Sequence, residues 1–118
     1  MYLHESIEGV PMAGIFPGDV VKTDRLQNFG YAMLRAESDG LLMDKGESFP
    51  VHEFHYYKAS AEGEAFTSIK ASTGRSRSCG YSGPAMYAGF PHLYLPSCGQ
   101  AAARFADAAA DYAHHADA

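Results

Sequence analysis

The sequence predicts an α/β fold class, with several short strands followed by a C-terminal helix. Short apolar or alternating runs separated by glycines extend from residue 12 to residue 90, which is typical of strands joined by tight turns. Residues 100–114 are instead rich in alanine, with apolar side chains along one stripe, as in an amphipathic helix. A chain of 118 residues is long enough for one modest domain.

The first predicted element is a helical stub over residues 2–7, where Leu3 and Ile7 are four residues apart but no side chain caps the start. Because a small independent domain more often begins with a capped element, we expect this one to be a portion of a larger α/β domain. Residues 12–16 predict a short buried strand, closed by the turn Pro17-Gly18-Asp19. Further strands are predicted over residues 30–36, 41–43, 51–57, 65–71 and 85–90.

The C-terminal helix is predicted from residue 100 to about residue 114, with Ser97 as its N-cap. No internal repeat or linker interrupts the chain before it. The stripe that this helix is expected to bury consists of Ala101, Phe105, Ala108 and Tyr112.

Composition and charge narrow the function classes. The net charge of −5 argues against nucleic acid or an anionic membrane as the main partner, because both would repel an acidic protein. No apolar run approaches the roughly 20 residues of a membrane-spanning helix. The start of the chain lacks the basic and apolar regions of a signal peptide, and two cysteines are too few for a disulfide framework. We therefore expect a cytoplasmic domain that handles a small molecule.

The segment His52-Glu53-Phe54-His55 is the main candidate for chemistry. On a continuous strand, Glu53 and His55 would share one face while His52 lay on the other. The carboxylate could then fix the tautomer of the imidazole. Metal binding by His52 and His55 is a weaker alternative, because the two face opposite sides and no third ligand is near in sequence. A purely structural role, as half-buried strand residues bonded to neighbouring backbone, is the other alternative.

A second candidate is His92, which follows the predicted strand 85–90 and Pro91. The carboxyl ends of strands are where α/β sheets usually keep their reactive groups. On local grounds alone, a core histidine with one hydrogen bond explains the residue more simply.

The two cysteines are interpreted as unreactive. Cys98 precedes Gly99 between a strand and a helix, as a nucleophile elbow would, but Pro96 stands where such an elbow needs a small residue. We interpret residues 97–99 as a helix-capping turn. Cys79 has basic neighbours that could lower its pKa, but no partnering base is nearby in sequence, so we interpret it as a loop or strand thiol.

Arg25, Arg75 and Arg77 could bind a carboxylate or phosphate, yet surface arginines are the usual explanation. No glycine-rich loop with a following Lys-Ser or Lys-Thr is present, so the sequence contains no recognisable nucleotide site.

Four blocks, in this order, resemble the glutamine amidotransferase domain of cobyrinic acid a,c-diamide synthases. They are Thr23-Asp24-Arg25-Leu26-Gln27-Asn28-Phe29-Gly30-Tyr31, Gly46-Glu47-Ser48-Phe49, His52-Glu53-Phe54-His55-Tyr56, and His92-Leu93 followed by a helix containing Ala102-Ala103-Arg104-Phe105. The resemblance extends from about Met12 to Ala106. Cobyric acid synthases share the domain type, but their usual motif in this region differs.

The resemblance implies a class I glutamine amidotransferase fold, an open α/β sheet with an antiparallel extension. It implies glutamine hydrolysis, with ammonia passed to an ATP-activated carboxylate on a corrin ring. That chemistry uses a cysteine thiolate as nucleophile and a histidine that moves protons. His92 matches the catalytic histidine, and Glu53 and His55 match a block that lines the active site.

This sequence also departs from the family pattern. The family's nucleophile lies in a Cys-Gly-Gly elbow, and this sequence starts just after the place of that elbow. The synthetase domain, with which the family's ATP and Mg²⁺ are associated, is not represented, so we expect this chain to bind no cofactor. Tyr94 stands where the family usually carries a second histidine. The acid that many other amidotransferase triads place near the histidine is missing, and this family commonly lacks it.

We therefore expect the glutaminase portion of a cobyrinic acid a,c-diamide synthase that is inactive alone. Glutamine and a corrin would be substrates of the full-length enzyme. The domain is also expected to expose apolar surface that drives homo-oligomerisation or docking to the missing part. The alternative is a non-catalytic remnant that serves as a small binding or assembly module.

Overall fold

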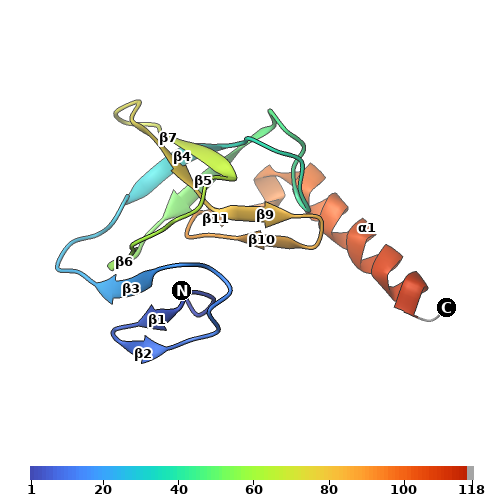
Figure 1. Cartoon of the computed structure of the whole chain (residues 1–118). Helices are drawn as coiled ribbons and strands as arrows, with labels where there is room; N and C mark the ends of the chain where they lie inside the picture. The colour runs from blue at the N-terminus through green and yellow to red at the C-terminus, as the bar shows by residue number, and fades with distance from the viewer. Residues whose placement is uncertain (117–118) are drawn as a thin grey trace.

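A computed structural model describes residues 1–116, which form three small sheets and a C-terminal helix (Figure 1). The predicted combination of several short strands with a C-terminal helix is therefore confirmed. The strand pairs are antiparallel except for β1 and β3, which run parallel. In chain order the elements are β1 (Ser6–Ile7), β2 (Val10–Pro11), β3 (Asp19–Lys22), β4 (Gly30–Ala36), β5 (Ser48–Glu53), β6 (Tyr57–Ala59), β7 (Phe66–Lys70), β8 (Ser76–Cys79), β9 (Tyr81–Gly83), β10 (Met86–Ala88), β11 (His92–Leu93), the 3₁₀ helix η1 (Leu95–Ser97) and α1 (Gly99–Ala116).

The largest sheet has five strands in the order β11-β5-β4-β7-β8. Its central strand β4 coincides with the predicted strand 30–36, and its alternation separates two faces. Leu34 and Ala36 are buried on the inner face, whereas Tyr31 and Met33 are exposed on the outer face. Strand β7 confirms the predicted strand 65–71.

One end of the inner face carries the hydrophobic core. The core residues of β4, β5, β7 and β8 are covered by the segment 41–43, by β10 and by the first turn of α1. The buried members of this cluster are Leu34, Ala36, Leu42, Met43, Val51, Phe66, Cys79, Cys98 and Ala101. The predicted strand 41–43 is wrong, because its apolar side chains fill the core from a loop. Arg104 of α1 holds this loop by donating to the Gly40 carbonyl at 2.6 Å.

The N-terminal elements differ from the prediction. Residues 2–7 form a turn leading into β1, not a helical stub. Glu8 and Gly9 have φ values of 50° and 78°, as a two-residue hairpin turn requires, and this turn pairs β1 with β2. Residues 12–16 form a loop rather than a strand, and Asp19, expected in a turn, begins β3. The small sheet is completed by β6 in the order β2-β1-β3-β6.

The predicted strand 51–57 is two strands in two different sheets. β5 ends at Glu53, and β6 starts at Tyr57 beside β3. Between them the backbone carbonyl of His55 accepts a hydrogen bond from the Gln27 amide at 2.8 Å. Strands β8 and β9 were not predicted, and β10 occupies the middle of the predicted strand 85–90.

The helix α1 is confirmed, but it does not bury its predicted stripe. Ala101 is fully buried, whereas Phe105 is 59% and Tyr112 77% exposed, because the helix extends away from the sheets (Figure 1). Ser97 does not cap it; its hydroxyl donates to the Tyr94 carbonyl instead. The Cα radius of gyration is 15.2 Å, above the roughly 13.5 Å expected for a compact domain of this length. No helix within residues 1–116 is long and apolar enough to cross a membrane.

Candidate functional site

Glu53 is a buried carboxylate at the end of β5. Only 4% of the residue is exposed, and its side chain lies on the inner face of the five-stranded sheet. Arg77 of β8 donates to Glu53 Oε1 and, through its other terminal nitrogen, to Glu62 Oε2 at 3.1 Å. Burial, the largest single effect, opposes the charge of this guanidinium, but Glu53 and the other nearby acidic groups together outweigh it and raise the pKa of Arg77. Glu53 is therefore held in place as the buried half of an ion pair.

His55 lies beside Glu53, although the strand ends between them. Its Nε2 is 3.9 Å from Glu53 Oε2, and its ring stacks on Phe90 with centroids 4.1 Å apart. Its Nδ1 lies 2.8 Å from the Tyr57 carbonyl, which can only accept, so Nδ1 carries a proton. The tautomer is thus fixed by the Tyr57 carbonyl. From the sequence, we expected the Glu53 carboxylate in this role instead. Nε2 is buried without a hydrogen-bond partner in the described chain.

His92 lies on the other face of the same sheet. It opens β11 and pairs in register with His52 of β5, so the two side chains point to the outer face. His92 is exposed and borders a hollow of about 430 Å³ that is also lined by His52, Tyr31 and Tyr94. The edge of the Tyr31 ring packs on His52 with centroids 4.7 Å apart. This outer surface offers an accessible imidazole among aromatic side chains.

The structure therefore does not bring the three predicted site residues together. Glu53 and His55 meet on the inner face, whereas His92 faces outward with His52. Because neighbouring residues of a strand point to opposite faces, His52 and Glu53 mark the two sides. A small substrate held against His92 would touch His52 but not the Glu53 carboxylate.

Both cysteines are buried in the core. Burial raises the pKa of Cys79 to about 11 and outweighs the charge of its basic neighbour Arg77, which acts to lower this pKa. Burial also raises the pKa of Cys98, whose thiol donates to the Tyr94 carbonyl at 3.2 Å. Neither thiol is presented as a nucleophile.

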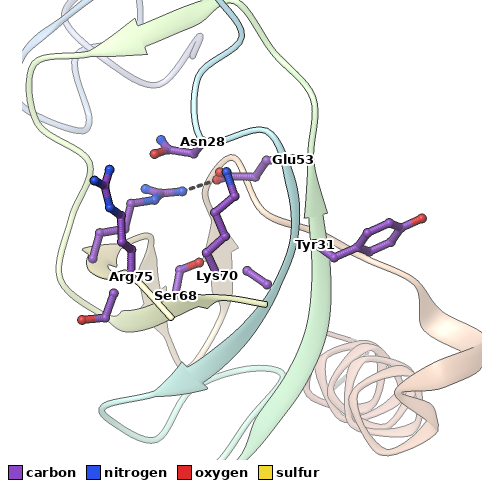
Figure 2. A pocket seen from close by; sticks show the side chains of 9 residues that line it. Asn28, Tyr31, Glu53, Ser68, Lys70 and Arg75 are labelled. Atoms are coloured by element: carbon purple, nitrogen blue, oxygen red, sulfur yellow. Dashed lines mark hydrogen bonds and ion pairs between the residues drawn. The ribbon is translucent and has the colours of Figure 1, made fainter. Parts of the chain in front are cut away.

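Sequence reasoning missed the role of Arg77 and of a polar cavity around it. At the open end of the inner face, opposite the core, a cavity of about 350 Å³ is bordered by Glu53, Ser68, Lys70, Arg75 and Arg77, among others (Figure 2). The run Arg75-Ser76-Arg77-Ser78-Cys79 alternates with the period of a strand. That alternation could have predicted that Arg77 and buried Cys79 share the inner face.

Within residues 1–116, no group of three or more His, Cys, Asp or Glu side chains is arranged to hold a metal ion.

Comparison with curated proteins identifies relatives across most of the chain. A cobyrinate a,c-diamide synthase of Clostridium acetobutylicum is 36% identical over 99 residues, which is 80% of this chain and 23% of the relative. A cobyrinate a,c-diamide synthase of Methanothermobacter thermautotrophicus is 33% identical over 89% of this chain and 24% of its own length. A hydrogenobyrinate a,c-diamide synthase of Thermobifida fusca is 31% identical over 92% of this chain and 24% of its own length.

No protein-family model matches the chain. The chain spans about a quarter of the length of the curated relatives it matches. Identity at this level over nearly the whole chain, to several proteins of the same name, confirms the resemblance drawn from the four sequence blocks. The chain is homologous to a segment, about a quarter in length, of the cobyrinate a,c-diamide synthases.

Proposed function

We propose that the chain is the C-terminal portion of the glutamine amidotransferase domain of a cobyrinic acid a,c-diamide synthase, acting in cobalamin biosynthesis in the cytoplasm. The whole synthase would amidate side-chain carboxylates of a corrin with ammonia released from glutamine, and other parts of it would use ATP and Mg²⁺ to activate those carboxylates. The observation that supports this proposal is the identity of 31% to 36% with such synthases over 80% to 92% of the chain.

His92 is the proposed proton-transfer residue in glutamine hydrolysis. The reaction needs a thiolate that attacks the amide carbon and a histidine that delivers a proton to the departing ammonia. An exposed imidazole beside a hollow of about 430 Å³ is accessible to such a substrate. The side chains of Glu53, the last residue of β5, and of His55 lie on the inner face, away from His92. We therefore assign them a positioning role, in which they fix the strand that carries His52 opposite His92.

The chain alone is proposed not to hydrolyse glutamine. Both of its cysteines are buried in the core, and burial raises the pKa of each thiol. Ammonia release from glutamine by the purified chain is therefore expected to equal the rate without protein. Release that is abolished by His92→Ala and by Cys98→Ala would contradict this.

A chimeric synthase tests the function directly. This chain would replace the homologous quarter of the Clostridium acetobutylicum synthase, and amidation of cobyrinic acid would be measured with glutamine and with ammonium as nitrogen source. His92→Ala is expected to lower the glutamine-dependent rate by about 100-fold or more and to leave the ammonium-dependent rate unchanged. His114→Ala, an exposed histidine of α1, is the matched control.

A non-catalytic binding or assembly module is the second candidate function. His92 lies on the opposite face of the sheet from Glu53 and His55. This separation favours the second candidate, because residues that act together in catalysis need to lie close together. In that case the His92→Ala chimera would use glutamine as well as the unsubstituted chimera does. Equal rates would reject the proposed catalytic role.

A further inference from the structure

The inner face of the five-stranded sheet changes character along its strands. At one end Leu34, Val51 and Phe66 lie under the loop 41–43 and α1. At the other end the inward positions are mainly polar, among them the buried Glu53 and Ser68, and they border a cavity. On β7, Ser68 and Lys70 lie two and four residues after the core residue Phe66, so their side chains lie on the same face as Phe66 and reach this polar end.

The cavity at this end measures about 350 Å³, within the range of small-molecule sites, which is roughly 300–1,000 Å³. Two cations enter it from one hairpin. Lys70 ends β7, and its backbone amide donates to the Arg75 carbonyl at 2.8 Å across the turn to β8. The side chains of Asn28 and Ser68 add neutral polar groups to the wall (Figure 2).

The charges of the cavity do not cancel. Arg77 is neutralised by Glu53 and Glu62, with which it forms hydrogen-bonded ion pairs. In contrast, no carboxylate within residues 1–116 lies within 4.0 Å of a side-chain nitrogen of Lys70 or Arg75. The chain as a whole is acidic, with a net charge of −5, so two unpaired cations in one hollow run against its average. Arg77, Glu53 and Glu62 together carry a charge of −1, so with Lys70 and Arg75 these five side chains have a net charge of +1.

We infer that this cavity binds a small dicarboxylate. Figure 2 shows the Lys70 amine at the Glu53 side of the cavity and the Arg75 guanidinium at the opposite side, beyond Asn28. Two separated cations match a ligand with two separated carboxylates better than a single phosphate. The planar guanidinium of Arg75 suits bidentate binding of one carboxylate, and the Lys70 amine suits the other. Ser68 and Asn28 can hydrogen-bond the carboxylate oxygens.

This site is distinct from the proposed glutaminase residue. His92 faces outward, and the cavity opens on the inner face, so the two are separated by the thickness of the sheet. Figure 2 agrees, because the ring of Tyr31 points away from the cavity, toward the outer face on which His92 lies. Dicarboxylate binding in this cavity can therefore be tested independently of the proposed function.

Binding of glutarate to the chain tests the inference. Isothermal titration would compare the unsubstituted chain, the double variant Lys70→Gln/Arg75→Gln, and the matched double variant Lys58→Gln/Arg35→Gln, which removes two exposed cations elsewhere. Saturable binding is expected that weakens by at least about tenfold in the first variant and is unchanged in the second. Circular dichroism of each variant would establish that it is folded.

Two further titrants and one localising measurement complete the test. Acetate and inorganic phosphate are expected to bind at least about tenfold more weakly than glutarate, because each engages one end of the cavity. Amide chemical-shift changes on glutarate addition should concentrate on β7 and β8. The inference is overturned by absence of saturable glutarate binding, by equal loss in both double variants, by phosphate that binds as tightly, or by shifts centred on His92.

Discussion

Replacing Arg77 by methionine should destabilise the fold more than any substitution of an exposed arginine. The variant keeps much of the apolar stem but leaves the Glu53 carboxylate, whose side chain is 5% exposed, without its cation. Removing one partner of a buried ion pair costs about 3–5 kcal/mol, because the other charge stays buried and unpaired. The Arg77 side chain is itself 23% exposed, so solvent screens the pair partly. We therefore expect a loss of about 3 kcal/mol at neutral pH.

The same reasoning predicts a specific pattern in a double-mutant cycle. Arg77→Met combined with Glu53→Gln removes the unpaired charge, so the double variant should be more stable than Arg77→Met alone, by about 1–2 kcal/mol.

Urea unfolding followed by circular dichroism measures these differences, with the free energy extrapolated to water. Arg35→Met is the matched control, since its guanidinium is exposed and pairs with exposed Glu37 on the outer side of the sheet. It should change the stability much less. The reasoning is refuted if Arg77→Met unfolds at the same urea concentration as the control, or if adding Glu53→Gln lowers its stability further.

Three other perturbations probe the core. The pKa of Cys79 is near 9.0 in the unfolded chain and about 11 in the fold, so its contribution to the free energy of unfolding is intact below pH 9 and is lost as the pH rises toward 11. Urea unfolding at alkaline pH should show a loss of about 2–3 kcal/mol in the free energy of unfolding, and this loss should be smaller in Cys79→Ala. Gly80→Ala should cost about 2 kcal/mol or more, because Gly80 has φ +77° and an added Cβ would lie 2.6 Å from Phe66; Gly74→Ala, at φ +72° with open space around it, isolates the backbone part of that cost. Leu34→Ala should cost about 2–5 kcal/mol in thermal or urea unfolding, since Leu34 is fully buried, and a smaller loss would mean that the loop 41–43 collapses into the space.

The parts of the fold that could be predicted are those in which local pattern and final environment agree. Strand β4 alternates between exposed positions and buried or half-buried ones, and α1 is rich in alanine, the residue with the highest helix propensity. The run 41–43 failed because three apolar residues have the same pattern in a buried loop as in a strand. The prediction of one continuous strand over residues 51–57 failed for another reason. The break after Glu53 involves partners distant in sequence, namely Arg77, which pairs with Glu53, and the Gln27 amide, which donates to the His55 carbonyl.

The candidate site shows the same limit. Glu53 and His55 were correctly placed next to each other, yet on the assumption of one continuous strand. His92 was expected after a strand, and it lies within a two-residue strand that pairs with His52. No local pattern indicates which strands pair with each other. The sequence therefore could not show that His92 lies on the same face of the sheet as His52. Arg75 and Arg77 were considered as carboxylate ligands, but the cavity itself was missed, because Asn28 and Glu53 join the β7–β8 hairpin only in the fold.

The location of the thiols constrains any glutaminase chemistry in which His92 takes part. Cys79 and Cys98 belong to the core on the inner side of the sheet, whereas His92 faces outward, so neither thiol can reach a substrate held against His92. If His92 acts as proposed, the nucleophile must approach the outer face from another segment or another chain. An interface with that segment or chain would then explain why aromatic side chains are exposed around His92. Tyr31 is 70% and Tyr94 68% exposed, and aromatic side chains of this kind are those that interfaces bury.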